Sequence, residues 1–137
     1  MTSEPFLVER EAGFTPNIFL LADFGYPSYG AMVLASSKVI KNNPEIVKAF
    51  VDASIEGWRQ YIYEDPSLGN ELIMLENSEM KEDILLQAIK KIRNYELVSS
   101  ENSKGLDIGS MTDTKWESFF KTMSSNGVYD ESLRWRE

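Results

Sequence analysis

One long amphipathic segment lies between two prolines, Pro44 and Pro66, and any fold of this chain has to accommodate it. Asn43-Pro44-Glu45 is typical of a helix start, because Asn accepts hydrogen bonds from free amides and Glu suits the positive end of the helix dipole. Between this start and the break at Asp65-Pro66, apolar residues recur at steps of three and four. This spacing predicts one long helix with a broad apolar face. The face consists of Ile46, Val47, Phe50, Val51, Trp58, Tyr61 and Ile62.

Shorter helices are predicted on either side of the long one from the same apolar spacing. The first has Pro5 in its first turn and Gly13 as its left-handed end, and Ser36 or Ser37 caps a second. Thr112 opens the last, which Asn126-Gly127 stops. The predicted segments are 5–12, 37–40, 68–75, 80–92 and 112–123. Four aromatic residues on the apolar faces of the predicted helices are expected in the core rather than at a binding site: Trp58, Trp116, Phe119 and Phe120.

Two short apolar runs predict β-strands. Asn17–Ala22 and Ala31–Ala35 are almost continuously apolar, which suits strands that are buried on both faces. Phe24–Gly30 lies between them and contains two glycines and a proline, which predict a loop. The expected fold class is therefore α/β, with helices predominating over a few buried strands.

Composition excludes several kinds of function. The 137 residues include 14 basic and 22 acidic side chains, so the net charge of −8 opposes binding to nucleic acid and to anionic lipid. The chain contains no cysteine and no histidine, which removes disulfides, thiolate nucleophiles, Cys/His zinc sites and the usual imidazole base. Apolar runs are far shorter than the roughly 20 residues of a membrane-spanning helix. No signal peptide is visible at Met1–Pro5, which taken alone suggests the cytoplasm.

The order of several segments resembles one protein family. These segments resemble the solute-binding proteins of ABC importers that are related to thiamine-precursor synthases and to nitrate-, sulfonate- and taurine-binding proteins. The resemblance runs from about Thr2 to Tyr129. It is carried by Thr2-Ser3-Glu4-Pro5, Leu20–Asp23, Gly25–Gly30, Asn43–Glu45 with Phe50 and Trp58, Ile108–Asp113, Trp116 and Phe119-Phe120.

The resemblance implies a type II periplasmic-binding-protein fold, of which this chain is the C-terminal portion. Residues 1–29 would form the end of the second lobe and the crossover segment, and residues 30–137 the C-terminal part of the first lobe with its C-terminal helices. In the complete protein two α/β lobes hold a ligand in their cleft and deliver it to an ABC permease. That protein would lie in the periplasm or at the cell surface. This chain is then a fragment, which we expect to bind ligand weakly or not at all by itself.

The loop between the predicted strands supplies the first candidate ligand contacts, Tyr26, Ser28 and Tyr29. The resemblance places the crossover between lobes here, and aromatic faces with hydroxyl groups suit a flat heterocycle. The alternative is a packed hinge, in which the tyrosines only cover the core.

Three further residues are weaker candidates. Glu4 is expected beside a helix start, where it faces a ligand or only complements the helix dipole. Ser3 accompanies it. Asp23 ends a predicted strand, where it contacts ligand or only forms a turn.

The leading hypothesis is a non-enzymatic binding module for a small organic molecule: a pyrimidine or thiamine precursor, a flavin-like ring or a sulfonate. One alternative is a structural module that pairs with itself as a homodimer through unpaired strand edges. A less favoured one is an enzyme like the thiamine-pyrimidine synthases, which use histidine and cysteine. We expect no cofactor and no metal, because the acidic cluster lacks the pattern of a calcium loop. That cluster is Glu76, Glu79, Glu82 and Asp83.

Overall fold

The computed structural model describes residues 4–99 and 107–133, and this part of the chain is built from helices without any β-strand. The predominance of helices predicted from the sequence is therefore confirmed. The elements are α1 (Glu4–Ala12), the 3₁₀ turn η1 (Leu21–Phe24), α2 (Ser37–Asn42), α3 (Pro44–Tyr63), α4 (Ser67–Glu76), α5 (Glu82–Asn94) and α6 (Asp113–Ser125).

The chain divides into two compact units, each assembled from segments that are distant in sequence. The first unit comprises the described residues of Met1–Asn17 and Ala35–Gly109, with helices α1 to α5. The second comprises those of Ile18–Leu34 and Ser110–Glu137, with η1 and α6. The predicted division at residues 29 and 30 into parts of two lobes stays a prediction.

Three predicted helix ends are confirmed in detail, whereas the Asn43 side chain makes no capping hydrogen bond at the start of α3, although that helix begins at Pro44 as predicted. Ser36 caps α2, with its hydroxyl accepting from the Val39 amide at 3.3 Å. Thr112 caps α6 in the same way through the Lys115 amide, also at 3.3 Å. Gly13 follows α1 with a φ of +70°, a left-handed conformation that glycine adopts without a Cβ penalty. Local capping chemistry therefore accounts for where these helices begin and end.

Both predicted strands are wrong for the described structure. Within Asn17–Ala22 the chain turns into η1, and Ala31–Ala35 has no regular structure. Neither run is buried as predicted, and Leu34 is 96% exposed. An apolar run indicates a need for burial, but a strand also needs a neighbouring strand to pair its backbone groups. The described residues supply no such neighbour.

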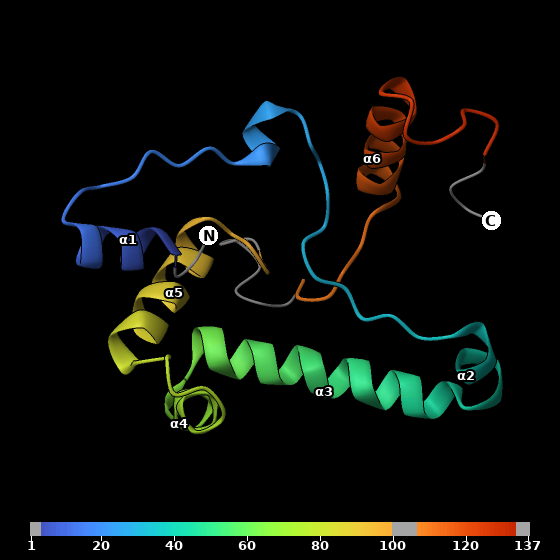
Figure 1. Ribbon diagram of the computed structural model, residues 1–137. Coiled ribbons are helices and arrows are strands. Elements are labelled where there is room, and N and C mark those ends of the chain that lie inside the picture. The colour runs from blue at the N-terminus through green and yellow to red at the C-terminus, as the bar shows by residue number, and fades with distance from the viewer. Residues whose placement is uncertain (1–3, 100–106, 134–137) are drawn as a thin grey trace. The chain divides into compact units, whose positions relative to one another are not determined.

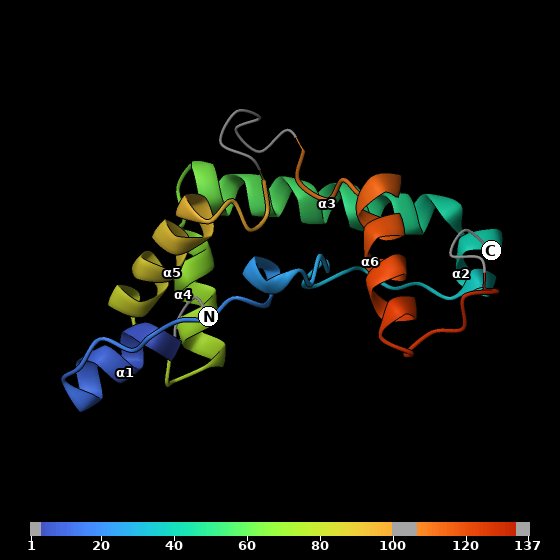
Figure 2. The ribbon, with the colours of Figure 1, turned by 90° about the horizontal axis from the view of Figure 1, so that it is seen from above.

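The core of the first unit lies at the C-terminal end of α3, where α5 packs against it and α4 packs against α5 (Figure 1). Figure 2 shows the same grouping from above, with α1 beside α5. Ile62 of α3 is fully buried, and Ile84 of α5 is 1% exposed. The buried apolar residues are Ile62, Ile84, Leu85, Ile89 and Ile108.

The apolar face of α3 is present as predicted, but most of its length is uncovered within the described structure. Ile46 and Phe50 are 66% and 60% exposed, and Trp58, which the sequence places in the core, is 44% exposed. Only Ile62, near the end of the helix, is fully enclosed. The spacing of apolar residues therefore predicted the helix and its face correctly, but it did not predict how much of that face is covered.

A close contact between α3 and α4 fixes the turn between them. The Tyr61 hydroxyl donates to Oδ1 of buried Asn70 at 2.8 Å, and burial raises the pKa of Tyr61. Gly69 lies directly under the Tyr61 ring, where an added Cβ would be 2.5 Å from Cδ2. The ring can approach α4 this closely because position 69 has no side chain.

We expect Gly69→Ala to lower the free energy of unfolding by about 1–3 kcal/mol, because the new methyl group displaces the Tyr61 ring. Gly57→Ala is the matched control, since a Cβ at this position in α3 meets nothing within 4 Å. It should raise stability by up to about 1 kcal/mol through helix propensity. Urea denaturation followed by circular dichroism checks both values, and equal effects of the two changes would contradict the packing argument.

Candidate functional site

The loop Gly25–Gly30 of the second unit leaves η1 through a left-handed glycine. Gly25 has a φ of +84° and donates its amide to the Ala22 carbonyl at 3.3 Å. The Tyr26 amide then donates to the Leu21 carbonyl at 3.1 Å. The chain reverses tightly at this point, and the side chains that follow pack against α6.

Tyr26 packs by an edge-to-face contact and keeps part of its ring open. Its ring centroid lies 5.7 Å from that of Phe119, with the two planes at 82°. The residue is 37% exposed. An edge contact with one partner and a partly exposed ring leave aromatic surface on which a flat molecule can stack.

Tyr29, by contrast, is engaged through both its hydroxyl and its ring. Its Oη accepts a hydrogen bond from the Thr112 amide at 2.8 Å, at the residue that caps α6. Its ring lies 5.4 Å from that of Trp116, and the Lys115 ammonium lies 4.3 Å from its centroid. Ser28 donates its hydroxyl to the Tyr29 carbonyl at 2.7 Å. Tyr29 thus holds the loop on the first turn of α6.

The aromatic side chains of α6 continue this row of ring contacts. Trp116 lies 6.4 Å from Phe119, and Phe119 lies 6.4 Å from Tyr129, each near a T-shaped geometry. Phe120 stacks on Tyr129 at 6.2 Å. The sequence assigns Trp116, Phe119 and Phe120 to a core, yet they are only half-buried, and no described residue of this unit is fully buried. Trp116 and Phe119, which contact Tyr29 and Tyr26, form the aromatic surface against which the loop packs rather than an enclosed core, and Tyr129 lies outside these loop contacts.

The six predicted site residues are only partly brought together. Tyr26, Ser28 and Tyr29 share the loop on α6, and Asp23 lies just before them as an exposed residue of η1. Glu4 is the exposed first residue of α1 and belongs to the other unit. Ser3 lies outside the described residues.

Sequence reasoning missed Lys115 and Trp116 as neighbours of the candidate loop. A helix-start signal at Thr112 identifies the first turn of α6, but it contains no information about which loop packs there. The hydrogen bond and ring contacts join residues more than 80 positions apart, as in the pair Tyr29 and Thr112, which are separated by 83.

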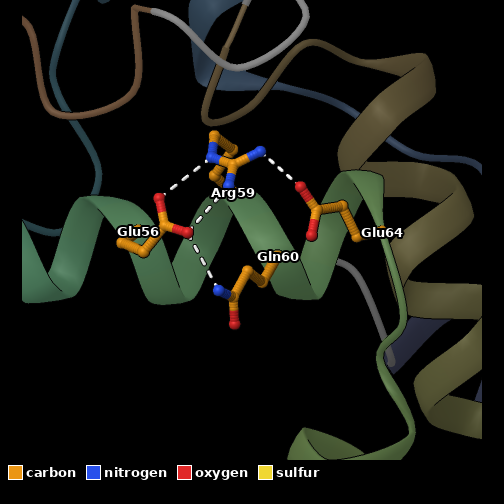
Figure 3. A network of polar contacts seen from close by, with 4 residues as sticks. All are labelled: Glu56, Arg59, Gln60 and Glu64. Carbon is orange, nitrogen blue, oxygen red and sulfur yellow. Dashed lines mark hydrogen bonds and ion pairs between the residues drawn. The ribbon is translucent and has the colours of Figure 1, made fainter.

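A separate polar cluster on α3 satisfies itself (Figure 3). The Arg59 guanidinium donates to both carboxylate oxygens of Glu56, at 2.7 and 3.0 Å, and to Glu64, while Gln60 donates to Glu56 at 2.9 Å. The hydrogen bonds from Arg59 and Gln60 lower the pKa of Glu56, and those to Glu56 and Glu64 raise the pKa of Arg59. With its donors directed at its own helix and the residue after it, this arginine is a poor anion receptor.

The acidic residues that the sequence groups around Glu76–Asp83 do not converge on one point. Glu82 and Asp83 lie in the first turn of α5, where they complement the helix dipole. Asp83 accepts from Arg10 at 3.2 Å. Across residues 4–99 and 107–133, no three acidic side chains are arranged to hold a metal ion.

Comparison with known families gives one match. A family described as NMT1/THI5 like matches residues 3–68. This match confirms the predicted resemblance for residues 3–68 and indicates a solute-binding role in general. All six predicted site residues fall inside the match, whereas α6 falls outside it. No curated protein and no solved structure matches the chain.

Among the described helices, none has the length and apolarity needed to cross a membrane.

We expect Tyr29→Phe to loosen the first turn of α6, because it removes the acceptor of the Thr112 amide and costs about 1 kcal/mol. Hydrogen exchange at that amide should become roughly five times faster. Tyr26→Phe is the control, since the Tyr26 hydroxyl has no hydrogen bond in the described structure. Unchanged exchange at Thr112 in Tyr29→Phe would contradict a holding role for this tyrosine.

Proposed function

We propose that this chain is part of a solute-binding protein of an ABC importer and that it captures a small organic molecule with a flat ring. The observation that carries the proposal is the packing of the Tyr26–Tyr29 loop on the aromatic face of α6, within a unit whose described residues include no fully buried one. The family match over residues 3–68 supports the same class of function.

The geometry suits the two tyrosines to different roles. Tyr26 offers partly exposed ring surface, so it is the residue we expect to stack on the ligand. Tyr29 is held by Thr112, Trp116 and Lys115, so it positions the loop. A pyrimidine, a thiamine precursor or a flavin-like ring suits such an aromatic surface better than an aliphatic solute does.

For the complete protein we propose the two-lobed α/β architecture of type II periplasmic binding proteins, acting in the periplasm or at the cell surface and delivering ligand to a permease. The uncovered apolar face of α3 supports this proposal, because Ile46 and Phe50 would pack against further polypeptide. No catalysis is proposed: the related synthases use histidine and cysteine, and this chain has neither.

We propose that the chain alone retains weak binding, because the Tyr26–Tyr29 loop and α6 are both present in it, so nuclear magnetic resonance titration with uracil and with riboflavin is the suitable test. For whichever of these two ligands binds, Tyr26→Ala should lower the affinity by about five- to ten-fold, through loss of stacking. Tyr26→Phe should retain it.

Tyr129→Ala is the matched control, because Tyr129 also contacts Phe119 and is 40% exposed, yet lies outside the loop. The Tyr129→Ala variant should bind the ligand with an affinity within about two-fold of the unchanged chain, since this change removes similar aromatic surface without touching the loop. Equal losses in Tyr26→Ala and Tyr129→Ala would count against Tyr26 as a ligand contact. Absence of binding by both rings would remove the proposed ligand class.

A second candidate function is self-association without ligand, favoured by the exposed apolar side chains on α3. In that case the sedimentation coefficient should rise with concentration, and Phe50→Lys should shift the chain toward monomer by placing a charge in the contact. Sedimentation velocity across a hundred-fold range of concentration checks this. A monomer throughout that range would eliminate the candidate.

A further inference from the structure

Lys115 is the one described cation of the second unit that makes no ion pair with a described carboxylate. The described residues of this unit include two lysines, Lys115 and Lys121. Lys121 is paired with Glu117 at 2.8 Å, four residues earlier on α6. Lys115 instead places its ammonium 4.3 Å from the centroid of the Tyr29 ring.

This placement fixes a positive charge beside the candidate site. An ammonium above an aromatic ring is held by the ring's negative face and still keeps hydrogen-bond donors for another partner. Trp116 contacts the same Tyr29 ring, so the charge stands at one end of the row of rings that continues through Phe119 to Tyr26. A ligand on this row would meet aromatic surface and one cation together.

The net charge of the chain opposes the binding of an anionic ligand unless a cation lies at the site itself. The whole chain carries a net charge of −8, which repels anions at long range, so an anionic ligand needs a local positive group. Arg59 does not provide one in the other unit, because Glu56 and Glu64 already occupy its guanidinium. Asp113 and Glu117 are the acidic neighbours of Lys115 on α6, and Glu117 is occupied by Lys121.

We propose that Lys115 makes this site selective for flat rings that carry an anionic group, such as a carboxylate or a phosphate. The inference rests on the proposed function, since it assigns the ligand class of the same loop and helix. Lys115 contacts the anionic substituent while the aromatic row contacts the ring.

Two matched pairs of probes separate charge from ring stacking: uracil with orotate, and riboflavin with flavin mononucleotide. Each pair shares a ring and differs by an anionic group. Titrations follow the indole N–H signal of Trp116 by nuclear magnetic resonance, assigned by its loss in Trp116→Phe. The anionic member of at least one pair should bind about three- to ten-fold more tightly than its neutral partner.

Lys115→Met removes the charge and keeps an unbranched side chain at this position, so it should abolish the preference for the anionic member of the pair. Lys121→Met is the control: it removes a charge of the same sign from the same helix and should leave the preference intact. In 1 M salt, where the screening length falls to about 3 Å, the preference should shrink in the unchanged chain.

The possible failures are distinguishable. Equal affinity for anionic and neutral rings in the unchanged chain would overturn the role of Lys115 and leave the ring-binding function standing. If Lys115→Met and Lys121→Met reduced the preference for the anionic ring equally, the role of Lys115 would also be overturned, because the preference would then depend on net charge alone. No binding of any of the four probes would remove the proposed ring-binding function and the inference together.

Discussion

The first unit depends on the enclosure of Ile62 at the end of α3. Its side chain is fully buried, and its backbone carbonyl accepts a hydrogen bond from the Arg93 side chain near the end of α5. Side-chain burial and a hydrogen bond to the backbone carbonyl therefore meet at Ile62, which joins α3 to α5. The preceding residue, Tyr61, reaches Asn70 and rests on Gly69, so α4 is held by the same end of α3.

Helices could be predicted closely from the sequence because their signals are local. Ser36, Thr112 and Gly13 each act within a few residues of themselves, and the structure places helix ends where these residues predict. Strands could not be predicted in this way, because pairing depends on a neighbour that an apolar run does not specify. Leu34 illustrates the difference: it reads as a buried strand residue and is almost fully exposed in the described structure.

The candidate site shows the same difference between what the local sequence predicts and what depends on contacts with distant residues. Tyr26 and Tyr29 were identifiable from their glycine-bracketed loop, but their different environments were not. Only the packing on α6 distinguishes a partly open ring on Phe119 from a ring held by Trp116 and Lys115. The assignment of Trp116, Phe119 and Phe120 to a closed core failed for a related reason, because helical spacing marks an apolar face without indicating whether anything covers it.

The composition of the second unit has a consequence for how the chain acquires its structure during synthesis. Its two segments, Ile18–Leu34 and Ser110–Glu137, are separated by the 35–109 stretch of the first unit. Tyr29 therefore leaves the ribosome long before Thr112 exists to meet it, and its loop must wait while about half of the chain is made. At roughly 5–20 residues per second, that delay is of the order of several seconds. Early folding of the first unit would shorten the effective loop to be closed, since the entropy of closure grows with the length of flexible chain.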